Sequence, residues 1–323
     1  MKVSVVIPTY KREQQLVDSI ECVLADSYPA FELIVVDQTE QHTAAVTVAL
    51  QAFGSDSRFR YIQLPIANLP LARNVGLLAA QGEVVIYVDD DVELSSDFIA
   101  AHVKRYEAPS VVAVAGRVVE GEGGQLLKTG SKPPPGRIRI NGLHETHFNQ
   151  TGYTGEVEWG QGCNMSFRRT ALVEIGGFDE RFVKNATHEE IDAFVRLRHA
   201  GGTAVFEPSA CLRHLVARTG GCRSTVAEVA HQKTTYRNMS LFFIKNYGLR
   251  GWGRYTLYAL QAMYSFVRIN RLSSARYVDL LRGHLDGVQS LWKDKGDQYS
   301  SELDIAVDGE VTLESIAISK FNV

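Results

Sequence analysis

The stretch GEVVIYVDDDVEL, residues 82–94, places three aspartates directly after a run of apolar residues. The run at 83–88 has the length and the β-branched composition of a buried strand. The neighbouring carboxylates of Asp89, Asp90 and Asp91 repel one another and lose solvation if they are buried, so a positive partner is expected beside them. We therefore predict that this strand leaves the core at a site that holds a cation.

Strand-like and helix-like segments alternate on both sides of this stretch. Val- and Ile-rich runs occur at 3–8, 31–38 and 59–64, and helical spacing of apolar residues occurs at 12–26 and 70–82. Strand–helix–strand units of this length make the strands parallel. The pattern predicts a doubly wound α/β sheet, in which ligands bind beyond the carboxyl ends of the strands. Further strands are expected at 111–119, 157–167 and 203–210, the last of which would close the sheet, and a further helix at 187–201.

The chain divides into three predicted parts. Residues 1–224 form the α/β domain, residues 225–298 form a helical extension, and residues 299–323 form a polar tail. The segment 120–156 is crowded with Gly, Pro and polar residues, and a long irregular segment of this kind is usually a functional lid or disordered.

Composition excludes several classes of protein. The chain of 323 residues is 45% hydrophobic and 22% charged, which is ordinary for a soluble globular protein. A net charge of -3 gives no basic footprint for nucleic acid. The four cysteines are not spaced as zinc ligands, and no G-x-G-x-x-G motif follows a strand, which disfavours a dehydrogenase. The apolar start is too short for a signal peptide and no run reaches about 20 apolar residues, so we expect a cytoplasmic protein.

The three aspartates have two interpretations. Clustered carboxylate oxygens suit a hard cation such as Mg²⁺ or Mn²⁺, which could bridge to phosphate oxygens. Alternatively, they form a solvated acidic turn before the next helix, with Ser95 or Ser96 as its N-cap.

Five segments, in order, resemble the successive motifs of family 2 glycosyltransferases. They are VSVVIPTYKR, ELIVVDQT, LARNVGLLAAQGEVVIYVDDD, GCNMSFRRTALVEIGGFDERF and HEEIDAFVRLRHAG, and together they span about residues 3–214. The resemblance implies the glycosyltransferase A fold, which is a Rossmann-like mixed sheet. It also implies inverting transfer of a sugar from a nucleotide-diphosphate sugar.

The resemblance assigns the donor nucleotide to the ends of the first two strands. Pro8, Thr9 and Tyr10 match positions that line the base, with Tyr10 able to stack on it, and Asp37 matches the acid that bonds the base edge. Arg73 matches a position on the nucleotide side. The alternatives are that Asp37 is a simple strand-end turn residue and that Arg73 lies on a solvated helix face.

The resemblance also implies the metal site. Asp89 and Asp91 match an Asp-x-Asp pair that contacts the ribose and a divalent metal, Mn²⁺ or Mg²⁺. Asp90 lies between them and is predicted to bind the nucleotide. His214, in CLRHL, occupies a place where many family members have a histidine that completes the metal site, although a lone histidine is more often structural.

The catalytic base is predicted in THEEID. The family pattern usually reads Glu-Asp here, whereas this chain has Glu189 and Glu190, so the base position falls on Glu190 and Glu189 is the alternative. Both could instead simply favour the positive N-terminal turn of the following helix. Trp159, Asn164 and Asp192 are assigned to the acceptor side. Trp159 could stack on a sugar or anchor the core, and Asp192 would orient or cap rather than react.

The helical extension carries its own pattern. Residues 248–276 are apolar almost all round between Arg254 and Arg268, and further arginines flank the run, namely Arg250, Arg271 and Arg276. This pattern fits a helix on an anionic membrane surface, at the inner face of the cell membrane. It fits equally a helix packed on the catalytic domain or a homodimer contact.

The sequence thus predicts a metal-dependent inverting glycosyltransferase. The donor would be UDP-linked and the acceptor a hydroxyl of a glycan or lipid-linked glycan, in cell-surface polysaccharide assembly. Two other classes remain open. A nucleotidyltransferase shares paired carboxylates but usually has a glycine-rich phosphate loop, which IPTYKREQQ lacks. A nucleotide-sugar-binding protein without catalysis is suggested by the change from Asp to Glu.

Overall fold

The computed structural model describes residues 1–120, 134–139, 144–145, 147–150, 152–217, 220–221 and 228–292. Most of the predicted loop at 120–156 lies outside the described residues, and so do the predicted boundary at residue 224 and the predicted tail at 299–323.

The first part of the chain alternates strands and helices, as its hydrophobic pattern predicts. Its elements are β1 (Val3–Thr9), α1 (Gln14–Leu24), β2 (Phe31–Asp37), α2 (Ala44–Phe53), β3 (Phe59–Gln63), α3 (Leu69–Ala79) and β4 (Val84–Val88). The strands pair in parallel in the order β3-β2-β1-β4. Every residue of β1, β2 and β4 is buried, because a parallel sheet is covered by helices on both faces.

The second part extends the same sheet with mixed pairing. Its elements are β5 (Val92–Leu94), α4 (Phe98–Lys104), β6 (Val111–Glu120), β7 (Arg137–Ile138), β8 (His144–Glu145), β9 (Gly155–Glu156), β10 (Asn164–Arg168), α5 (Arg169–Glu174), α6 (Glu189–His199) and β11 (Thr203–His214). The sheet continues β4-β10-β6-β11-β5, and β10 is antiparallel to both of its neighbours. The predicted Rossmann-like doubly wound mixed sheet is confirmed.

Three details differ from the prediction. Helix α2 was not expected, because Val46, Thr47 and Val48 are β-branched and weaken the helical signal. Strand β10 begins at Asn164 rather than at residue 157. The edge of the sheet is β5, not the segment at 203–210, because β11 runs on to His214 and pairs with β5.

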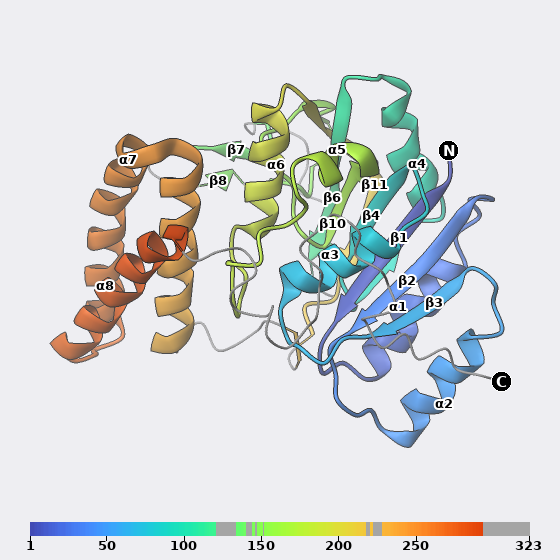
Figure 1. Cartoon of the computed structure of the whole chain (residues 1–323), viewed down its shortest axis with the longest axis horizontal. Coiled ribbons are helices and arrows are strands. Elements are labelled where there is room, and N and C mark those ends of the chain that lie inside the picture. Colours follow the sequence, from blue (N-terminus) through green and yellow to red (C-terminus); the bar gives the residue numbers. More distant parts are fainter. Residues whose placement is uncertain are drawn as a thin grey trace.

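Two hydrophobic cores lie on the two faces of the sheet. One contains Leu16, Ile20 and Val46 from α1 and α2, and the other contains Leu71 and Phe194 from α3 and α6. Figure 1 shows these layers with α6 standing between the sheet and a pair of long helices. The second core extends into that helical pair, so the pair is packed onto the sheet domain through α6.

The helical pair consists of α7 (Val229–Ile269) and α8 (Ser274–Gln289), and we call it the arm. Gly248 interrupts α7 with φ 63° and ψ -166°, a conformation that glycine alone adopts readily, so α7 bends there. The second half of α7 then packs against α8 (Figure 1). Within the part of the chain that the structure describes, no helix is both long and apolar enough to cross a bilayer. With α7 and α8, the predicted C-terminal helical extension is present.

Candidate functional site

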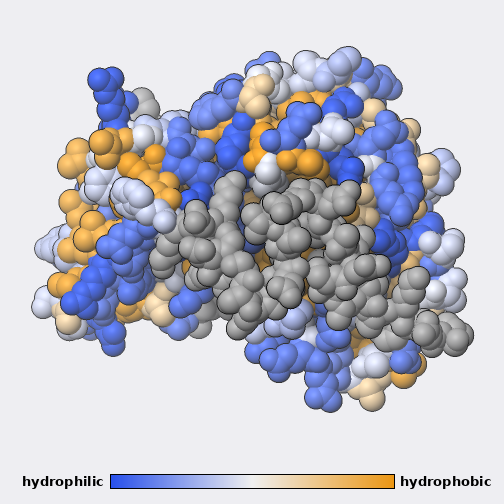
Figure 2. Space-filling view, in the orientation of Figure 1, coloured by the Kyte–Doolittle hydropathy of each residue, from blue (hydrophilic) through white to orange (hydrophobic). Residues whose placement is uncertain are grey.

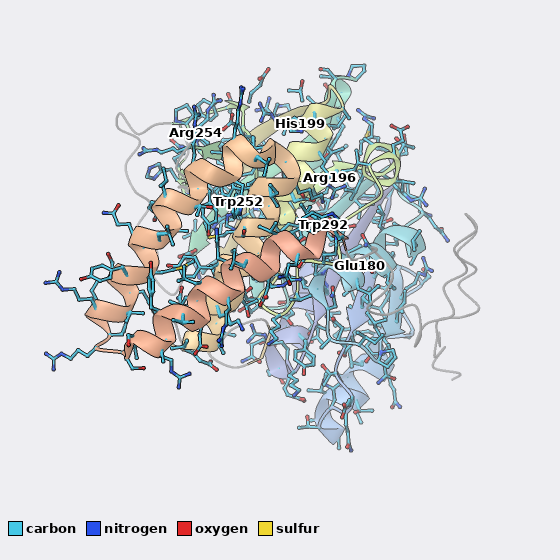
Figure 3. All side chains as sticks on the ribbon, turned by 60° about the vertical axis from the view of Figure 1, so that its left-hand side comes forward. Glu180, Arg196, His199, Trp252, Arg254 and Trp292 are labelled. Atoms are coloured by element: carbon cyan, nitrogen blue, oxygen red, sulfur yellow. The ribbon has the colours of Figure 1, made fainter. Side chains whose placement is uncertain are left out.

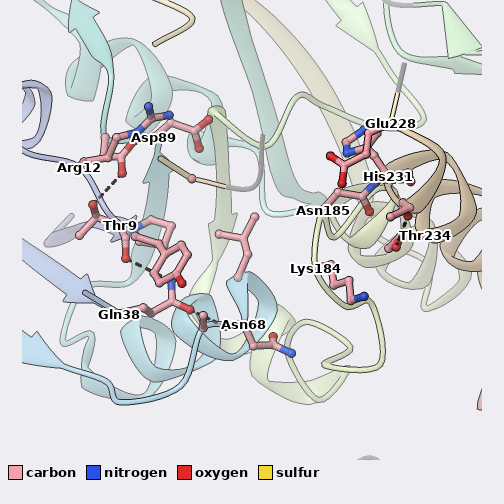
Figure 4. A pocket seen from close by; sticks show the side chains of 17 residues that line it. Thr9, Arg12, Gln38, Asn68, Asp89, Lys184, Asn185, Glu228, His231 and Thr234 are labelled. Atoms are coloured by element: carbon pink, nitrogen blue, oxygen red, sulfur yellow. Dashed lines mark hydrogen bonds and ion pairs between the residues drawn. The ribbon is translucent and has the colours of Figure 1, made fainter. Parts of the chain in front are cut away.

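A cavity of about 500 Å³ opens at the carboxyl ends of β1, β2 and β4. Figure 4 shows its two walls, one from the sheet domain and one from the segment before α6 and the start of α7. The lining residues are Pro8, Thr9, Tyr10, Arg12, Gln38, Ala67, Asn68, Leu69, Asp89, Asp90, Lys184, Asn185, Gly221, Glu228, Ala230, His231 and Thr234. Five of the predicted nucleotide-binding residues thus lie around one cavity, namely Pro8, Thr9, Tyr10, Asp89 and Asp90.

Asp90 is held by the sheet domain itself. Thr9 Oγ1 donates to Asp90 Oδ2 at 2.7 Å, and Arg12 Nε donates to Asp90 Oδ1 at 3.0 Å. Burial raises the pKa of Asp90 to about 7, against the opposing effects of Arg12 and Thr9. Arg12 is therefore the buried positive partner that three adjacent carboxylates require.

Asp91 also contacts Arg12, whose Nη2 lies 3.4 Å from its Oδ2, but Asp89 and Asp91 share a second partner, His214 at the end of β11. His214 Nε2 lies 3.2 Å from Asp91 Oδ1 and 3.6 Å from Asp89 Oδ2. Burial opposes ionisation of Asp91, but His214 and the backbone N–H of Ala217 outweigh it and lower its pKa. The three side chains can each offer one ligand atom, all within 4.8 Å of one another. Two carboxylates and an imidazole form a donor set that fits Mn²⁺ or Mg²⁺.

The alternative of a solvated acidic turn is wrong. The exposed fractions of Asp90 and Asp91 are 5% and 1%. The N-cap of α4 is Asp97, not Ser95 or Ser96. Strand β5 begins directly after Asp91 and pairs antiparallel with β11. This segment is therefore part of the sheet and not an exposed turn.

Asp37 lies at the end of β2 but does not line the cavity. It is fully buried, and His42 Nε2 lies 2.5 Å and Tyr61 Oη 2.9 Å from its Oδ2. Its Oδ1 accepts from the backbone N–H of Thr39, which is the turn predicted as the alternative role. Burial disfavours a charged His42, but Asp37 and Glu13 outweigh this and raise the pKa of His42. The neighbouring Gln38 reaches the cavity instead.

Arg73 lies inside the protein, so the alternative of a solvated helix face is wrong. Its exposed fraction is 2%, and it forms an ion pair with Glu189, which is also buried. Arg73 Nη2 also donates to the carbonyl of Gly162, where a side chain would come within 2.8 Å of the guanidinium. Arg73 is not among the residues that line the cavity.

Glu190 differs from Glu189 in exposure. It is half-buried at the start of α6. Removal of water raises its pKa, and repulsion by Asp89 adds to this effect, although the charge of Arg73 opposes it. Because Asp89 is near enough to act on Glu190, the two acidic clusters face the same region. Glu190 is not among the cavity residues, but it follows the segment that forms the second wall.

The segment before Glu190 has an unusual backbone. Lys184, Ala186 and His188 all have positive φ, of 58°, 47° and 77°. Residues other than glycine disfavour this region, so surrounding contacts must hold it. Asn185 Nδ2 donates to Thr235 Oγ1 at 2.8 Å, and Asn238 Nδ2 donates to Asn185 Oδ1 at 3.1 Å. The first half of α7 therefore fixes the turn that leads into Glu190.

Asp192 is a link between α6 and the arm. It is fully buried, and its carboxylate accepts from Arg196, Lys245 and Asn246 at 2.7–2.8 Å. Lys245 Nζ also lies 2.5 Å from Asp179 Oδ2. An acceptor-side role for Asp192 would be indirect, through the position of α6.

Trp159 and Asn164 both lie in the interior. Trp159 is 5% exposed and packs edge-on against Phe148, as the core-anchor alternative predicts. Asn164 is fully buried, where His102 Nε2 lies 3.0 Å from its Oδ1 and its amide donates to the carbonyl of Arg117. Neither residue presents its side chain to the cavity described here.

Sequence reasoning missed several residues of the cavity. Arg12 lies only three residues after Thr9, close to the end of the first strand. Because the three aspartates require a nearby cation, this position could have predicted it. Asn68 is the N-cap of α3, with Pro70 following it, which is also a recognisable pattern. His231 and Thr234 come from α7, where nothing in the sequence points to the cavity.

Comparisons with known proteins identify a family model and relatives that this chain matches. A family model described as glycosyl transferase family 2 matches residues 4–176. The glucosyl-dolichyl phosphate glucuronosyltransferase of Haloferax volcanii is 33% identical over 184 residues, which are 55% of this chain and 56% of that relative. The match therefore spans about half the length of that relative.

Two solved structures share the fold. One is S. aureus TarS 1–349 in complex with UDP-GlcNAc, with a TM-score of 0.62 and 16% identity, covering 90% of this chain and 81% of that one. The other is the mannosyltransferase PcManGT from Pyrobaculum calidifontis in complex with GDP-Man and Mn²⁺, with a TM-score of 0.53 and 16% identity, covering 91% and 88%.

Proposed function

We propose that this chain, which belongs to glycosyl transferase family 2, transfers a sugar from a nucleotide-diphosphate sugar to a hydroxyl of a glycan or lipid-linked glycan, with inversion. The observation that carries the proposal is the grouping of Asp91 and His214 with Asp89, which itself lines a cavity together with Pro8 and Tyr10. The cavity would hold the nucleobase of the donor beside Tyr10 and the metal-bound diphosphate beside Asp89.

The donor would lie along the wall that the sheet domain provides. Tyr10 is half-exposed in this wall and can stack on a nucleobase. Asp89, Asp91 and His214 would hold a divalent cation, which supplies Lewis-acid stabilisation of the charge that develops on the leaving diphosphate. The relatives bind different nucleotides, UDP-GlcNAc and GDP-Man. Of these two nucleotides, we propose UDP for the donor of this chain.

Glu190 would take the proton from the acceptor hydroxyl. A raised pKa suits this task, because a carboxylate accepts protons best when its pKa approaches the working pH. Glu189 suits it less, because its ion pair with Arg73 favours the charged form. The hydroxyl oxygen forms its bond to the anomeric carbon from the face opposite the diphosphate, the bond to the diphosphate breaks, and the configuration inverts.

Thermal stabilisation would identify the donor and test the metal site. Each of a panel of sugar nucleotides is added to the protein with and without Mn²⁺, and the midpoint of unfolding is measured. We expect one nucleotide class to raise the midpoint only with Mn²⁺, and Asp91→Asn to abolish that increase. An increase that is the same in Asp91→Asn would remove this carboxylate from the donor site.

Release of nucleoside diphosphate would then separate catalysis from binding. We expect release to depend on the presence of a glycan acceptor, and the product to have the inverted anomeric configuration by NMR. Tight donor binding without release, across a panel of glycan and lipid-linked acceptors, would favour a nucleotide-sugar-binding protein. Release of pyrophosphate from a nucleoside triphosphate and a sugar phosphate would instead show a nucleotidyltransferase.

A further inference from the structure

The second half of α7, the turn that follows it and the start of α8 have an unusual charge. Residues 248–278 contain five arginines, namely Arg250, Arg254, Arg268, Arg271 and Arg276, and no Asp, Glu or Lys. The whole chain carries -3, so the positive charge is concentrated on the arm. Arg276 lies 3.4 Å from Asp279 on α8, whereas Arg250, Arg254 and Arg268 lie on the exposed side of α7.

These arginines share one side of the helix with apolar residues. Spacings of three and four residues place side chains on one helical face. The exposed residues that follow this spacing are Arg250, Arg254, Leu257, Gln261, Tyr264 and Arg268, and we call them the basic stripe. The exposed fractions of Leu257 and Tyr264 are 73% and 59%.

The opposite side of the same helix is already covered. Tyr255, Ala259 and Met263 are fully buried, and the second half of α7 packs along α8. Figure 3 shows this pairing and the side chains that extend from the arm, and Figure 2 shows apolar and polar residues interspersed over the arm at the left. The basic stripe is therefore not needed for packing the arm.

Charge selects among the occupants of such a surface. A symmetric dimer through the stripe would bring arginines of two copies together, which opposes association. An anionic bilayer complements the arginines, and exposed Leu and Tyr side chains can enter its interface. We propose that the basic stripe docks on the surface of an anionic phospholipid bilayer.

The docking has a consequence for the cavity. His231 and Thr234, in the first half of α7, line the cavity, and the second half of the same helix carries the stripe. A docked arm would hold the cavity near the bilayer, where a lipid-linked acceptor lies. This consequence rests on the proposed function, whereas the docking itself does not.

Co-sedimentation with vesicles tests the docking. The full chain is mixed with vesicles of phosphatidylcholine alone or of phosphatidylcholine with phosphatidylglycerol. We expect binding to the anionic vesicles only, weakened by salt. The triple variant Arg250→Gln/Arg254→Gln/Arg268→Gln should bind about 10²-fold more weakly, because each basic residue near the surface contributes separately.

A matched control removes three exposed cations from the sheet domain. Lys2→Gln/Lys104→Gln/Arg213→Gln has the same change in net charge and should bind nearly as the wild type does. Equal binding of the two triple variants would overturn the proposal, and so would equal binding to neutral vesicles. A dimer in light scattering that Leu257→Ser/Tyr264→Ser abolishes, together with no vesicle binding, would assign the stripe to a second copy.

Transfer to a soluble acceptor separates this proposal from the proposed function. The Arg triple variant should retain this activity while it loses vesicle binding. Vesicle binding by a chain that transfers no sugar would leave the docking intact and contradict the proposed function alone.

Discussion

The two acidic clusters of this protein look alike in the sequence and differ in the structure. Each has three acids within four residues, Asp89–Asp91 after β4 and Glu189–Asp192 at the start of α6. In each, a buried arginine from another segment contacts the acids: Arg12 contacts Asp90 and Asp91, and Arg73 contacts Glu189. The acids that remain partly exposed are Asp89 and Glu190.

The difference lies in what surrounds the available acid. Asp89 lies beside Asp91 and His214, so it belongs to a set of ligand atoms. Glu190 is instead affected by removal from water, which raises its pKa, by the charge of Arg73, which opposes this, and by the charge of Asp89, which adds to it. This difference supports our proposal that one cluster holds a cation and the other takes a proton.

The largest effect is expected from Glu190→Gln. The amide keeps the size of the side chain but cannot accept the proton, so turnover should fall about 10²–10⁴-fold. Donor binding, measured by thermal shift with Mn²⁺, should stay unchanged, because the clusters serve separate tasks. Turnover close to that of the wild type would move the base to another group, with Glu189 as the next candidate.

The second effect is on stability and concerns Arg73. Arg73→Met leaves Glu189 buried without its cation, and breaking a buried pair in this way costs about 3–5 kcal/mol. Chemical denaturation measures this loss in the free energy of unfolding. The double variant Arg73→Met/Glu189→Leu should recover most of it, because an apolar pair can replace a buried ion pair. A loss below about 1 kcal/mol in Arg73→Met would mean that water reaches Glu189.

The sheet and the metal cluster were accessible to sequence reasoning for a physical reason. Strands covered on both faces must be apolar throughout, so β1, β2 and β4 are visible as unbroken runs. The strand ends then place Pro8, Tyr10 and the aspartates at one edge of the sheet, and the resemblance to family 2 glycosyltransferases supplied their predicted roles. The match of the first five predicted strands and helices to the structure follows from this constraint.

The identity of each acid's partner was not accessible. Arg73 and Glu189 are more than a hundred positions apart, and nothing local shows that they meet. The family resemblance assigned Trp159 and Asn164 to the acceptor side, but an aromatic ring and an amide can also satisfy a core. Only the distant neighbours Phe148 and His102 decide between the two roles.

A third prediction concerns the link between α6 and the arm. In Lys245→Met, Asp192 keeps Arg196 and Asp179 keeps Arg181, so neither acid loses all of its cations. The loss should be that of hydrogen bonds to charged groups, about 1.5–3 kcal/mol, which is smaller than for Arg73→Met. A loss as large as that of Arg73→Met, in the same denaturation experiment, would show that Lys245 dominates this network.

The smallest expected effect is the pH dependence of the stability that Lys245 contributes to this link. Burial favours a neutral Asp179, but Arg181 and Lys245 outweigh it and hold the pKa of Asp179 below its usual range. A carboxyl whose pKa is lowered by folding stabilises the protein above its unfolded pKa, and this contribution disappears as the pH falls toward the folded value. The difference in unfolding free energy between wild type and Lys245→Met should therefore be constant from pH 7 to about 5 and shrink below about pH 4.

An exposed ion pair provides the control for this titration. Arg58 contacts Asp56 at 2.7 Å on the surface, where solvent screens the pair. Arg58→Met should change the free energy of unfolding by less than about 1 kcal/mol at any pH. If the Lys245→Met difference stayed constant down to pH 3, Asp179 would not depend on Lys245 for its charge, and packing together with the hydrogen bond from Asn246 to Asp192 would hold α6 to the arm.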